Sequence, residues 1–447
     1  MLISFTVQNW MSFRDAVTFS MVAGMERQHS ERILRFKKYT TKLLPISAIY
    51  GGNASGKSNF FKAMFFARYL IVSGTTPNEF IPVEPFLLNP KAIQQPSRFV
   101  FELMINETFY EYSFSITQKA VVEEKLVEVG ATREKKLYHR RNRIVEFDKT
   151  LEKDEPFLQF VARGTRENQL FLTNSVIQNT ENFRHIYDWF NNTLKLIAPD
   201  AHYKPFEQFY DEESPLYNLV NEVLPALDTG ISRLCIEKFP FENTSFARSL
   251  GTRFQENVKE GASVEIVTDY NKDMRLVVTK KNGELIAKKM VAYHHGEDGG
   301  NVKFEIFKES DGSKRVIDLL PAFLDISSKN ANSVYLIDEI DRSLHTLLTH
   351  KLIEAYLAGC SAETRSQMLL TTHDVLLIDQ RLLRRDEIWV TERDNTGNST
   401  LIPFSDYKDI RYDKDIRKSY LQGRMGGVPR ILLDGTFNTN TVKNGGQ

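Results

Sequence analysis

The sequence predicts an α/β protein with a mixed sheet, an antiparallel β region and an inserted, mainly helical segment. Three patterns along the 447 residues predict this fold. A short apolar run at 46–50 enters a glycine-rich turn and then a helix, as in the first unit of a parallel sheet. Residues 97–148 alternate apolar and polar positions, which is typical of antiparallel strands. After residue 316, helical and apolar segments alternate, which indicates βαβ units.

The composition limits the class of protein. The chain has 58 basic and 58 acidic side chains, so we do not expect a uniformly basic nucleic-acid module, although a local basic groove is compatible with this balance. Cys235 and Cys360 lie far apart, so we expect no disulfide or zinc site and place both thiols in the core of a reduced protein. The N-terminus lacks a signal peptide, and no apolar run reaches the ~20 residues of a membrane span. We therefore expect a cytoplasmic protein that does not enter a membrane.

The individual elements follow from local patterns. Strands are expected at Ile3–Gln8 and Ala16–Val22, and a helix is expected from Asn59 to about Val72. Further strands are expected at 98–103, 109–114, 124–129, 231–238, 334–337, 368–371 and 387–390, with several more across 263–292. Further helices are expected at 182–190, 216–224, 316–324, 347–357 and 376–380. The residues after Asp434 are small and polar, so we expect a disordered tail.

One motif points to an anion. Residues Gly51–Ser58 read Gly-Gly-Asn-Ala-Ser-Gly-Lys-Ser and match the phosphate-loop pattern G-x-x-x-x-G-K-[ST]. Backbone N–H groups of such a turn converge with the following helix on one anion, Lys57 can reach the β- and γ-phosphates, and the Ser58 hydroxyl can ligate Mg²⁺. An ordinary glycine turn is the alternative, but the flanking strand and helix favour a nucleoside triphosphate site. We therefore expect ATP and Mg²⁺ as cofactors, with nucleotide contacts from Gly51, Asn53, Ala54, Ser55, Gly56, Lys57, Ser58 and Asn59.

Two carboxylates far downstream complement this loop. The apolar run Val334–Ile337 ends in Asp338 and Glu339. Because ligand sites gather at the carboxyl ends of parallel strands, we expect Asp338 to hold Mg²⁺ and Glu339 to act as general base on the attacking water. Solvated acids before a helix are the alternative, which the phosphate loop makes the weaker one.

Two more segments are candidates for the same chemistry. His373 ends the next apolar strand and could hydrogen-bond the γ-phosphate and the water as a second catalytic residue. Ser310 and Gly312 precede the helix at 316–324 and could present a hydroxyl and a backbone N–H to an anion. Taken singly, the histidine is better explained as a surface or capping residue and the serine as an ordinary helix N-cap; the position of His373 one βα unit after Asp338 and Glu339 favours the catalytic role.

Together, these motifs resemble the head domain of ABC-type ATPases, in the branch of the structural-maintenance-of-chromosomes (SMC), RecF and OLD proteins. The resemblance implies that two heads sandwich two ATP molecules, with Ser310 and Gly312 of one head at the γ-phosphate held by the other. It also implies that residues 341–345 form a D-loop across the dimer. The ranges that it implies are ATPase lobe I at 1–168, a mainly helical insertion at 169–260, ATPase lobe II at 261–432 and the tail at 433–447.

A narrower resemblance covers about residues 1–432. Segments 310–321, 385–389 and 420–429 are similar to ATPases of the RloA/AbiLi type, with PtuA and AriA as cousins, from bacterial anti-phage and abortive-infection operons. This similarity implies a homodimer or higher homo-oligomer, a separate effector such as a nuclease, and a nucleic-acid or phage-encoded trigger. Two alternatives stay open: a RecF-like DNA-maintenance ATPase that clamps DNA, and a scaffold that holds ATP with little turnover.

The chain departs from the related heads near its start. Their Asn-Phe-Arg-Ser opening is Asn9-Trp10-Met11-Ser12 here, so an arginine that contacts phosphate is absent at position 11, and Arg14 is the substitute that we consider. Gln169 is our candidate for the glutamine of the Q-loop.

Two further features are less specific. The basic run 135–143 could bind a nucleic-acid backbone, but the solvated face of a hairpin explains it better. His294 and His295 enter a glycine-rich turn, where we expect a loop rather than a metal site.

Overall fold

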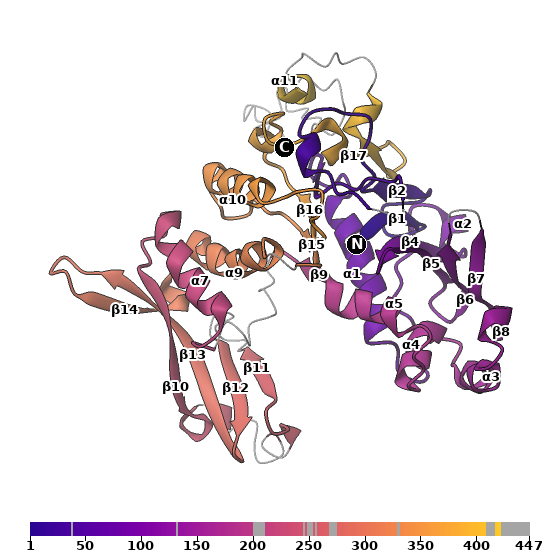
Figure 1. Ribbon diagram of the computed structural model, residues 1–447, viewed down its shortest axis with the longest axis horizontal. Coiled ribbons are helices and arrows are strands. Elements are labelled where there is room, and N and C mark those ends of the chain that lie inside the picture. Colours follow the sequence, from indigo (N-terminus) through magenta and orange to yellow (C-terminus); the bar gives the residue numbers. More distant parts are fainter. Residues whose placement is uncertain are drawn as a thin grey trace, which may run out of the picture.

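The protein is described by a computed structural model. The structure describes residues 1–36, 39–130, 133–199, 211–244, 246–247, 254, 257–267, 275–328, 331–407 and 416–421. These residues form a central mixed sheet and two antiparallel sheets (Figure 1). The predicted tail at 433–447 and most of the segment 420–429 lie outside the described residues.

The central sheet has the strand order β18-β17-β3-β16-β15-β9. Its strands are β3 (Ile46–Tyr50), β9 (Leu194–Ile197), β15 (Val334–Ile337), β16 (Gln367–Thr371), β17 (Ile388–Arg393) and β18 (Ser399–Pro403). Neighbouring strands are parallel except for the edge pair β17–β18. The inner strands β3, β15 and β16 are buried along their whole length, which explains their continuous apolar runs. Since the strands are parallel and in register, the carboxyl ends of these three meet at one edge of the sheet.

The large antiparallel sheet contains the alternating segments of the N-terminal region. Its order is β2-β1-β4-β5-β6-β7-β8. The strands are β1 (Leu2–Gln8), β2 (Val17–Ser20), β4 (Ser97–Ile105), β5 (Thr108–Ile116), β6 (Val121–Val129), β7 (Glu134–Arg141) and β8 (Ile144–Phe147). The basic run 135–143 therefore lies in the β7–β8 hairpin, and the prediction of a hairpin is confirmed. Its middle is not solvated as expected, because His139 and Arg140 are buried.

Helices cover both faces of the central sheet. Helix α1 (Lys57–Val72) packs between this sheet and the large antiparallel sheet, and apolar side chains of all three form one core. Helices α9 (Asp311–Ile326) and α10 (Thr346–Ala358) cover the opposite face and form a second core (Figure 1). Shorter helices are α2 (Pro90–Ile93), α3 (Glu155–Gly164), α4 (Phe171–Ile177), α5 (Arg184–Asp188) and α11 (Ile416–Leu421).

A smaller sheet, which we call the outer sheet, projects beyond α7 (Pro215–Val223) and α9 (Figure 1). Its order is β10-β13-β12-β11, with β14 also paired to β13. The strands are β10 (Arg233–Pro240), β11 (Ser263–Val267), β12 (Arg275–Lys281), β13 (Glu284–His295) and β14 (Asn301–Glu305). The range 169–260 thus holds helices together with strands β9 and β10, and its definition as a mainly helical insertion stays a prediction.

Two local predictions are wrong. The helix expected at 376–380 is only a short 3₁₀ turn at Val375–Leu377, which Asp374 caps and which ends at Ile378, where the backbone leaves the helical region. Cys235 and Cys360 are free, half-buried thiols; Cys360 packs against the second core, whereas the prediction of a core position is wrong for Cys235. Leu234 and Ile236 of β10 face the core, so strand alternation turns Cys235 to the other side.

None of the described helices is long and apolar enough to cross a membrane. The expectation of a cytoplasmic protein stays a prediction.

A buried carboxylate ties the large antiparallel sheet to α4. Glu124 on β6 is inaccessible to solvent and accepts hydrogen bonds from the hydroxyls of Tyr112 and Tyr138 at 3.0 and 2.9 Å. It also accepts from the backbone N–H groups of Phe171 and Leu172, at 2.6 and 2.9 Å. These bonds hold the first turn of α4 against two neighbouring strands.

We expect Glu124→Ala to lower the free energy of unfolding by about 3 kcal/mol, since it leaves two hydroxyls and two backbone N–H groups without an acceptor. Urea denaturation followed by circular dichroism measures the change. Glu181→Ala is the control, because that exposed carboxylate pairs with Arg184 at the surface and should cost less than about 1 kcal/mol. Equal stability of the two variants would contradict the role given to Glu124.

Candidate functional site

The phosphate-loop motif connects the carboxyl end of β3 to the first turn of α1. Two of its glycines are required by geometry. A Cβ at Gly51 would lie 2.6 Å from the backbone oxygen of Thr391, and one at Gly56 would lie 2.7 Å from the Ser399 hydroxyl. Gly56 also has φ of 119°, in the left-handed region that favours glycine.

The β17–β18 hairpin braces the loop from one side. The hydroxyls of Thr391 on β17 and Ser399 on β18 both donate to the backbone oxygen of Ser55, at 3.0 and 2.7 Å. Asn59 follows the loop and donates from its side chain to the Ser12 hydroxyl at 2.8 Å. The loop is therefore held in one conformation by residues from both ends of the chain.

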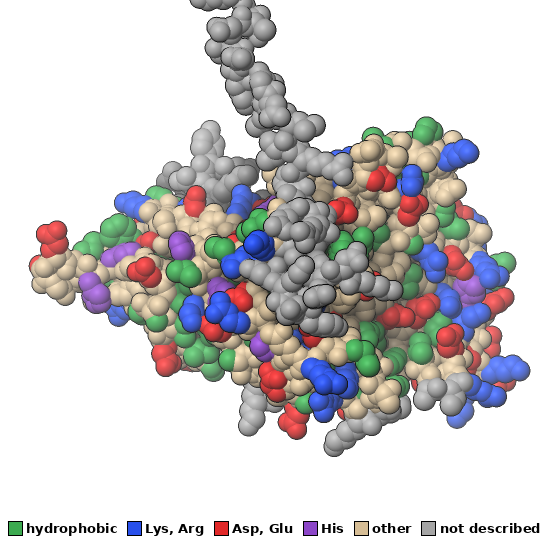
Figure 2. Space-filling model, turned by 90° about the horizontal axis from the view of Figure 1, so that it is seen from above, with side chains coloured by type: hydrophobic (Ala, Val, Ile, Leu, Met, Phe, Trp, Pro, Cys, Tyr) green, Lys and Arg blue, Asp and Glu red, His purple; other side chains and the backbone are tan. Residues whose placement is uncertain are grey.

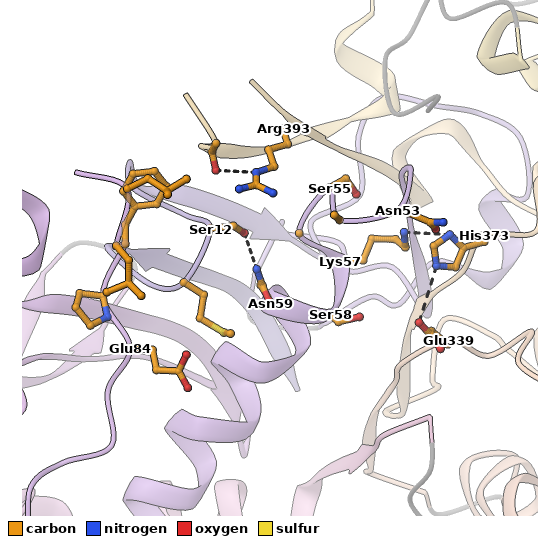
Figure 3. A pocket seen from close by; sticks show the side chains of 18 residues that line it. Ser12, Asn53, Ser55, Lys57, Ser58, Asn59, Glu84, Glu339, His373 and Arg393 are labelled. Carbon is orange, nitrogen blue, oxygen red and sulfur yellow. Dashed lines mark hydrogen bonds and ion pairs between the residues drawn. The ribbon is translucent and has the colours of Figure 1, made fainter. Parts of the chain in front are cut away.

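Lys57 lies inside the loop. Its ammonium donates to the backbone oxygens of Gly51 and Gly52 at 2.6 and 3.1 Å, and it lies 3.2 Å from Nδ1 of His373 (Figure 3). Burial lowers the pKa of Lys57 to about 8, although the negative charges of Asp338 and Glu339 oppose this shift. A partly desolvated cation at the centre of a turn is well placed to attract phosphate.

Asp338 follows β15 and is buried next to the loop. Thr371 at the end of β16 donates its hydroxyl to Oδ1 of Asp338. Burial and the neighbouring charge of Glu339 raise the pKa of Asp338, while hydrogen bonds from Thr371 and from the Ser58 hydroxyl lower it. Ser58 and Asp338 therefore lie together, and their oxygen atoms form a donor set that fits Mg²⁺.

Glu339 has a strained backbone. Its φ of 49° is in the left-handed region, which costs a non-glycine residue roughly 1 kcal/mol or more. The Glu339 N–H donates to the Thr371 hydroxyl at 2.8 Å, which holds this turn. Its carboxylate Oε1 lies 3.9 Å from Nε2 of His373 (Figure 3). Burial and the nearby Lys57 cation lower the pKa of His373, which favours the neutral imidazole.

These groups share one cavity of about 580 Å³. Its walls include Asn53, Ala54, Ser55, Gly56, Lys57, Ser58, Asn59, Glu339 and His373. Gly51 lies behind Lys57, and Asp338 lies buried beside Ser58. The structure therefore brings together the residues predicted from three distant motifs, while their chemical roles stay predictions.

Ser310 and Gly312 do not line this cavity. Ser310 is the N-cap of α9, and its hydroxyl accepts from the Ser313 N–H at 3.1 Å. A Cβ at Gly312 would lie 3.0 Å from the backbone oxygen of Ser343, so the bare backbone of α9 approaches the segment 341–345. Within one chain, these two predicted contact segments lie against each other and apart from the phosphate loop.

Two predicted assignments near the site are wrong. Arg14 pairs with Asp15 at 2.8 Å and does not line the cavity, whereas Met11 does. Gln169 is buried and its backbone oxygen accepts from Arg140 at 2.6 Å. The neighbouring Asn168 accepts a hydrogen bond from Thr75, which follows the carboxyl end of α1. The phosphate loop lies at the other end of α1, so Gln169 is far from it along the helix.

His294 and His295 end strand β13 rather than forming a loop. Nε2 of His294 lies 2.7 Å from a carboxylate oxygen of Glu309. Within the described part of the chain, no cluster of three or more metal-binding side chains occurs.

Two arginines at the site were missed by the sequence reasoning. Arg315 on α9 is buried and donates to the backbone oxygens of Asp338 and Glu339 at 3.4 and 3.5 Å, which joins α9 to the carboxylate turn. Arg393 lies at the end of β17 and lines the cavity. Asp338 was predicted because ligand sites gather at the carboxyl ends of parallel strands. The same rule points to Arg393, because β17 ends three residues later than predicted.

Comparison with known families agrees with this geometry. The model of a family described as "AAA domain, putative AbiEii toxin, Type IV TA system" matches residues 46–379, which span the loop, the carboxylates and His373. The chain belongs to this family. It is an ATPase of the AAA type, and its central sheet of mainly parallel strands gives it an α/β fold.

Two solved structures resemble the chain over most of its length. The SMC head domain from Thermotoga maritima is 12% identical and covers 90% of this chain and 98% of its own, with a TM-score of 0.35. The SMC head bound to the C-terminal winged-helix domain of ScpA is 14% identical, and the match covers 92% of this chain and 99% of the SMC head, with a TM-score of 0.39. Both scores are low, so nothing about the site or partners follows from them. No curated protein sequence matches the chain significantly.

We expect the pKa of His373 to rise when Lys57 is replaced by Met, because the variant removes the cation that lies beside Nδ1. NMR titration of the histidine ring protons measures this pKa. Lys62→Met, which removes an exposed cation on the same helix, should leave it unchanged. An unchanged value in the Lys57 variant would mean that burial alone sets the shift.

Proposed function

We propose that this protein is an ATP-hydrolysing switch of a bacterial anti-phage system and controls a separate effector, such as a nuclease. The observation that carries the proposal is the shared cavity, in which the phosphate loop faces Glu339 and His373. A loop that only anchored a nucleotide would not need a carboxylate and a neutral imidazole at the same place.

The residues divide the chemistry among them. The backbone of Gly51–Ser58 binds the triphosphate, and Lys57 moves from its carbonyl contacts to the phosphates. Ser58 and Asp338 would hold Mg²⁺, which when bound neutralises phosphate charge. Glu339 accepts a proton from the attacking water. One N–H of Lys57 stays on Nδ1 of His373 while its other N–H groups contact the phosphates, so His373 donates a hydrogen bond from Nε2.

The arrangement of Ser310 supports a two-headed assembly. Ser310 caps the exposed N-terminus of α9, where backbone N–H groups can face an anion. This helix end does not line the cavity of its own chain. We infer that Ser310 and Gly312 of one copy close the cavity of another around ATP, with the segment 341–345 at the same contact. Such an assembly forms with ATP and opens after hydrolysis, and this change is the signal to the effector.

The biological setting rests on the family. Its description names a toxin and a toxin–antitoxin system, which is compatible with the RloA/AbiLi type that the motifs resemble. We propose a homodimer or higher oligomer in the cytoplasm, and a nucleic-acid or phage-encoded trigger.

The alternative of a DNA clamp gains less support. In the β7–β8 hairpin, Arg143 pairs with Glu167 at 2.6 Å, and Arg140 is buried, so neither guanidinium is free to bind a phosphate backbone. On the face shown in Figure 2, basic and acidic side chains are interspersed. A surface of mixed charge does not favour a DNA backbone.

We expect Glu339→Gln to reduce ATP hydrolysis by about 10²–10⁴-fold while ATP binding is kept, because the variant removes a base and leaves the loop intact. Phosphate release and equilibrium binding measure the two effects. Glu363→Gln, on the loop after α10, is the control and should change neither.

The same variant tests the alternatives. Unchanged phosphate release in Glu339→Gln would support a scaffold that holds ATP, and full phage protection by this variant would contradict the switch.

We expect Ser310→Arg to abolish ATP-dependent association of the Glu339→Gln protein, since the new side chain fills the proposed contact with the partner's phosphate. Analytical ultracentrifugation with and without ATP measures the oligomer. Ser361→Arg, at an exposed turn, should associate as before. Association that survives Ser310→Arg would rule out this interface, but not ATP binding.

A further inference from the structure

The cavity has a second end that the hydrolytic residues do not use. Lys57, His373 and Glu339 gather on the right of Figure 3, Arg393 lies to their left above Ser12, and Glu84 lies at the far left. The remaining walls at this end are Met11, Gly397 and the segment 84–88, which we call the strap.

The strap is held in place by the N-terminal turn. The Met11 N–H donates to the backbone oxygen of Glu84 at 2.8 Å, and the side chain of Asn9 accepts from the Phe86 N–H at 3.1 Å. Asn9 and Met11 both have left-handed backbones, with φ of 53° and 46°. These two residues belong to the Asn-Trp-Met-Ser opening, and the turn places the apolar Met11 side chain in the cavity wall.

The β17–β18 turn closes on the strap. Gly397 has φ of 82°, in the left-handed region that favours glycine, and the end of the Leu88 side chain packs against it. Leu87 and Leu88 are 66% and 61% exposed, although they line a cavity. Two exposed leucines at the edge of a binding cavity indicate an apolar part of the ligand.

Among the described residues that line this end of the cavity, Arg393 is the one cation. Its Nε donates to the Gly397 carbonyl at 3.1 Å, which fixes the guanidinium beside the turn. The guanidinium lies above Ser12 and to the left of Ser55 and Lys57 (Figure 3). A flat cation beside exposed aliphatic side chains is suited to an aromatic ring, because it can stack on the ring's face.

We propose that this end of the cavity binds the base of the nucleoside triphosphate, with the Arg393 guanidinium stacked on the ring and Met11, Leu87 and Leu88 forming the apolar wall. The inference rests on the proposed function, which places the phosphates at Lys57. It gives Arg393 a specificity role that is separate from phosphate binding and hydrolysis.

The test compares ATP with inorganic tripolyphosphate, which carries the phosphates but no base. Isothermal titration with Mg²⁺ gives both affinities for the unmodified protein and for Arg393→Ala. We expect ATP to bind about tenfold more weakly to Arg393→Ala, with no change for tripolyphosphate. Arg14→Ala is the matched control, because Arg14 is an arginine near the cavity that pairs with Asp15 and does not line it.

The remaining outcomes separate the possible failures. Equal weakening of both ligands by Arg393→Ala would place Arg393 at the phosphates and overturn the proposal, and so would unchanged binding of ATP. Leu88→Ser is the second variant, and it should also weaken ATP without affecting tripolyphosphate. If the unmodified protein binds neither ligand, or Lys57→Ala binds both as before, the proposed function itself fails.

Discussion

The parallel register of β3, β16 and β15 is the constraint on which the site depends. Ile46 pairs with Met368, and Gln367 pairs with Val334, so the three strands end together. Their carboxyl ends place the phosphate loop, His373 and the carboxylate pair Asp338–Glu339 at one edge. A slip of one residue in either ladder would turn the alternate side chains of a strand to the opposite core, so the two cores keep the register fixed.

Several groups at the site are in energetically unfavourable states: three have shifted pKa values and one has a strained backbone. Lys57 and His373 have lowered pKa values, the pKa of Asp338 is raised, and Glu339 occupies a left-handed backbone. Burial disfavours the charged form of each of the three titrating groups, because water is removed without full compensation. An anion with a divalent cation would supply the missing partners, so binding relieves a cost that the folded chain carries.

The β17–β18 hairpin has two tasks at this site. Thr391 and Ser399 fix the phosphate loop through the Ser55 carbonyl, while Arg393 and Gly397 form the opposite end of the cavity. Because one hairpin both braces the loop and lines the cavity, a ligand that contacts Arg393 would be positioned relative to the loop. The hairpin thus connects recognition of the ligand's far end to the position of its phosphates.

The sequence by itself determined the parts whose signals are local. The loop at 51–58, the strand that ends at Asp338 and the alternation at 97–148 depend on turn chemistry and on side-chain periodicity, which neighbouring residues set. Sequence reasoning failed for Gln169, because its environment depends on how Arg140 and the end of α1 pack around it. Only the tertiary structure brought Arg393 and Arg315 to the site and kept Ser310 outside the cavity. These positions result from strand order and from the close approach of distant loops, and neither leaves a periodic signal in the chain.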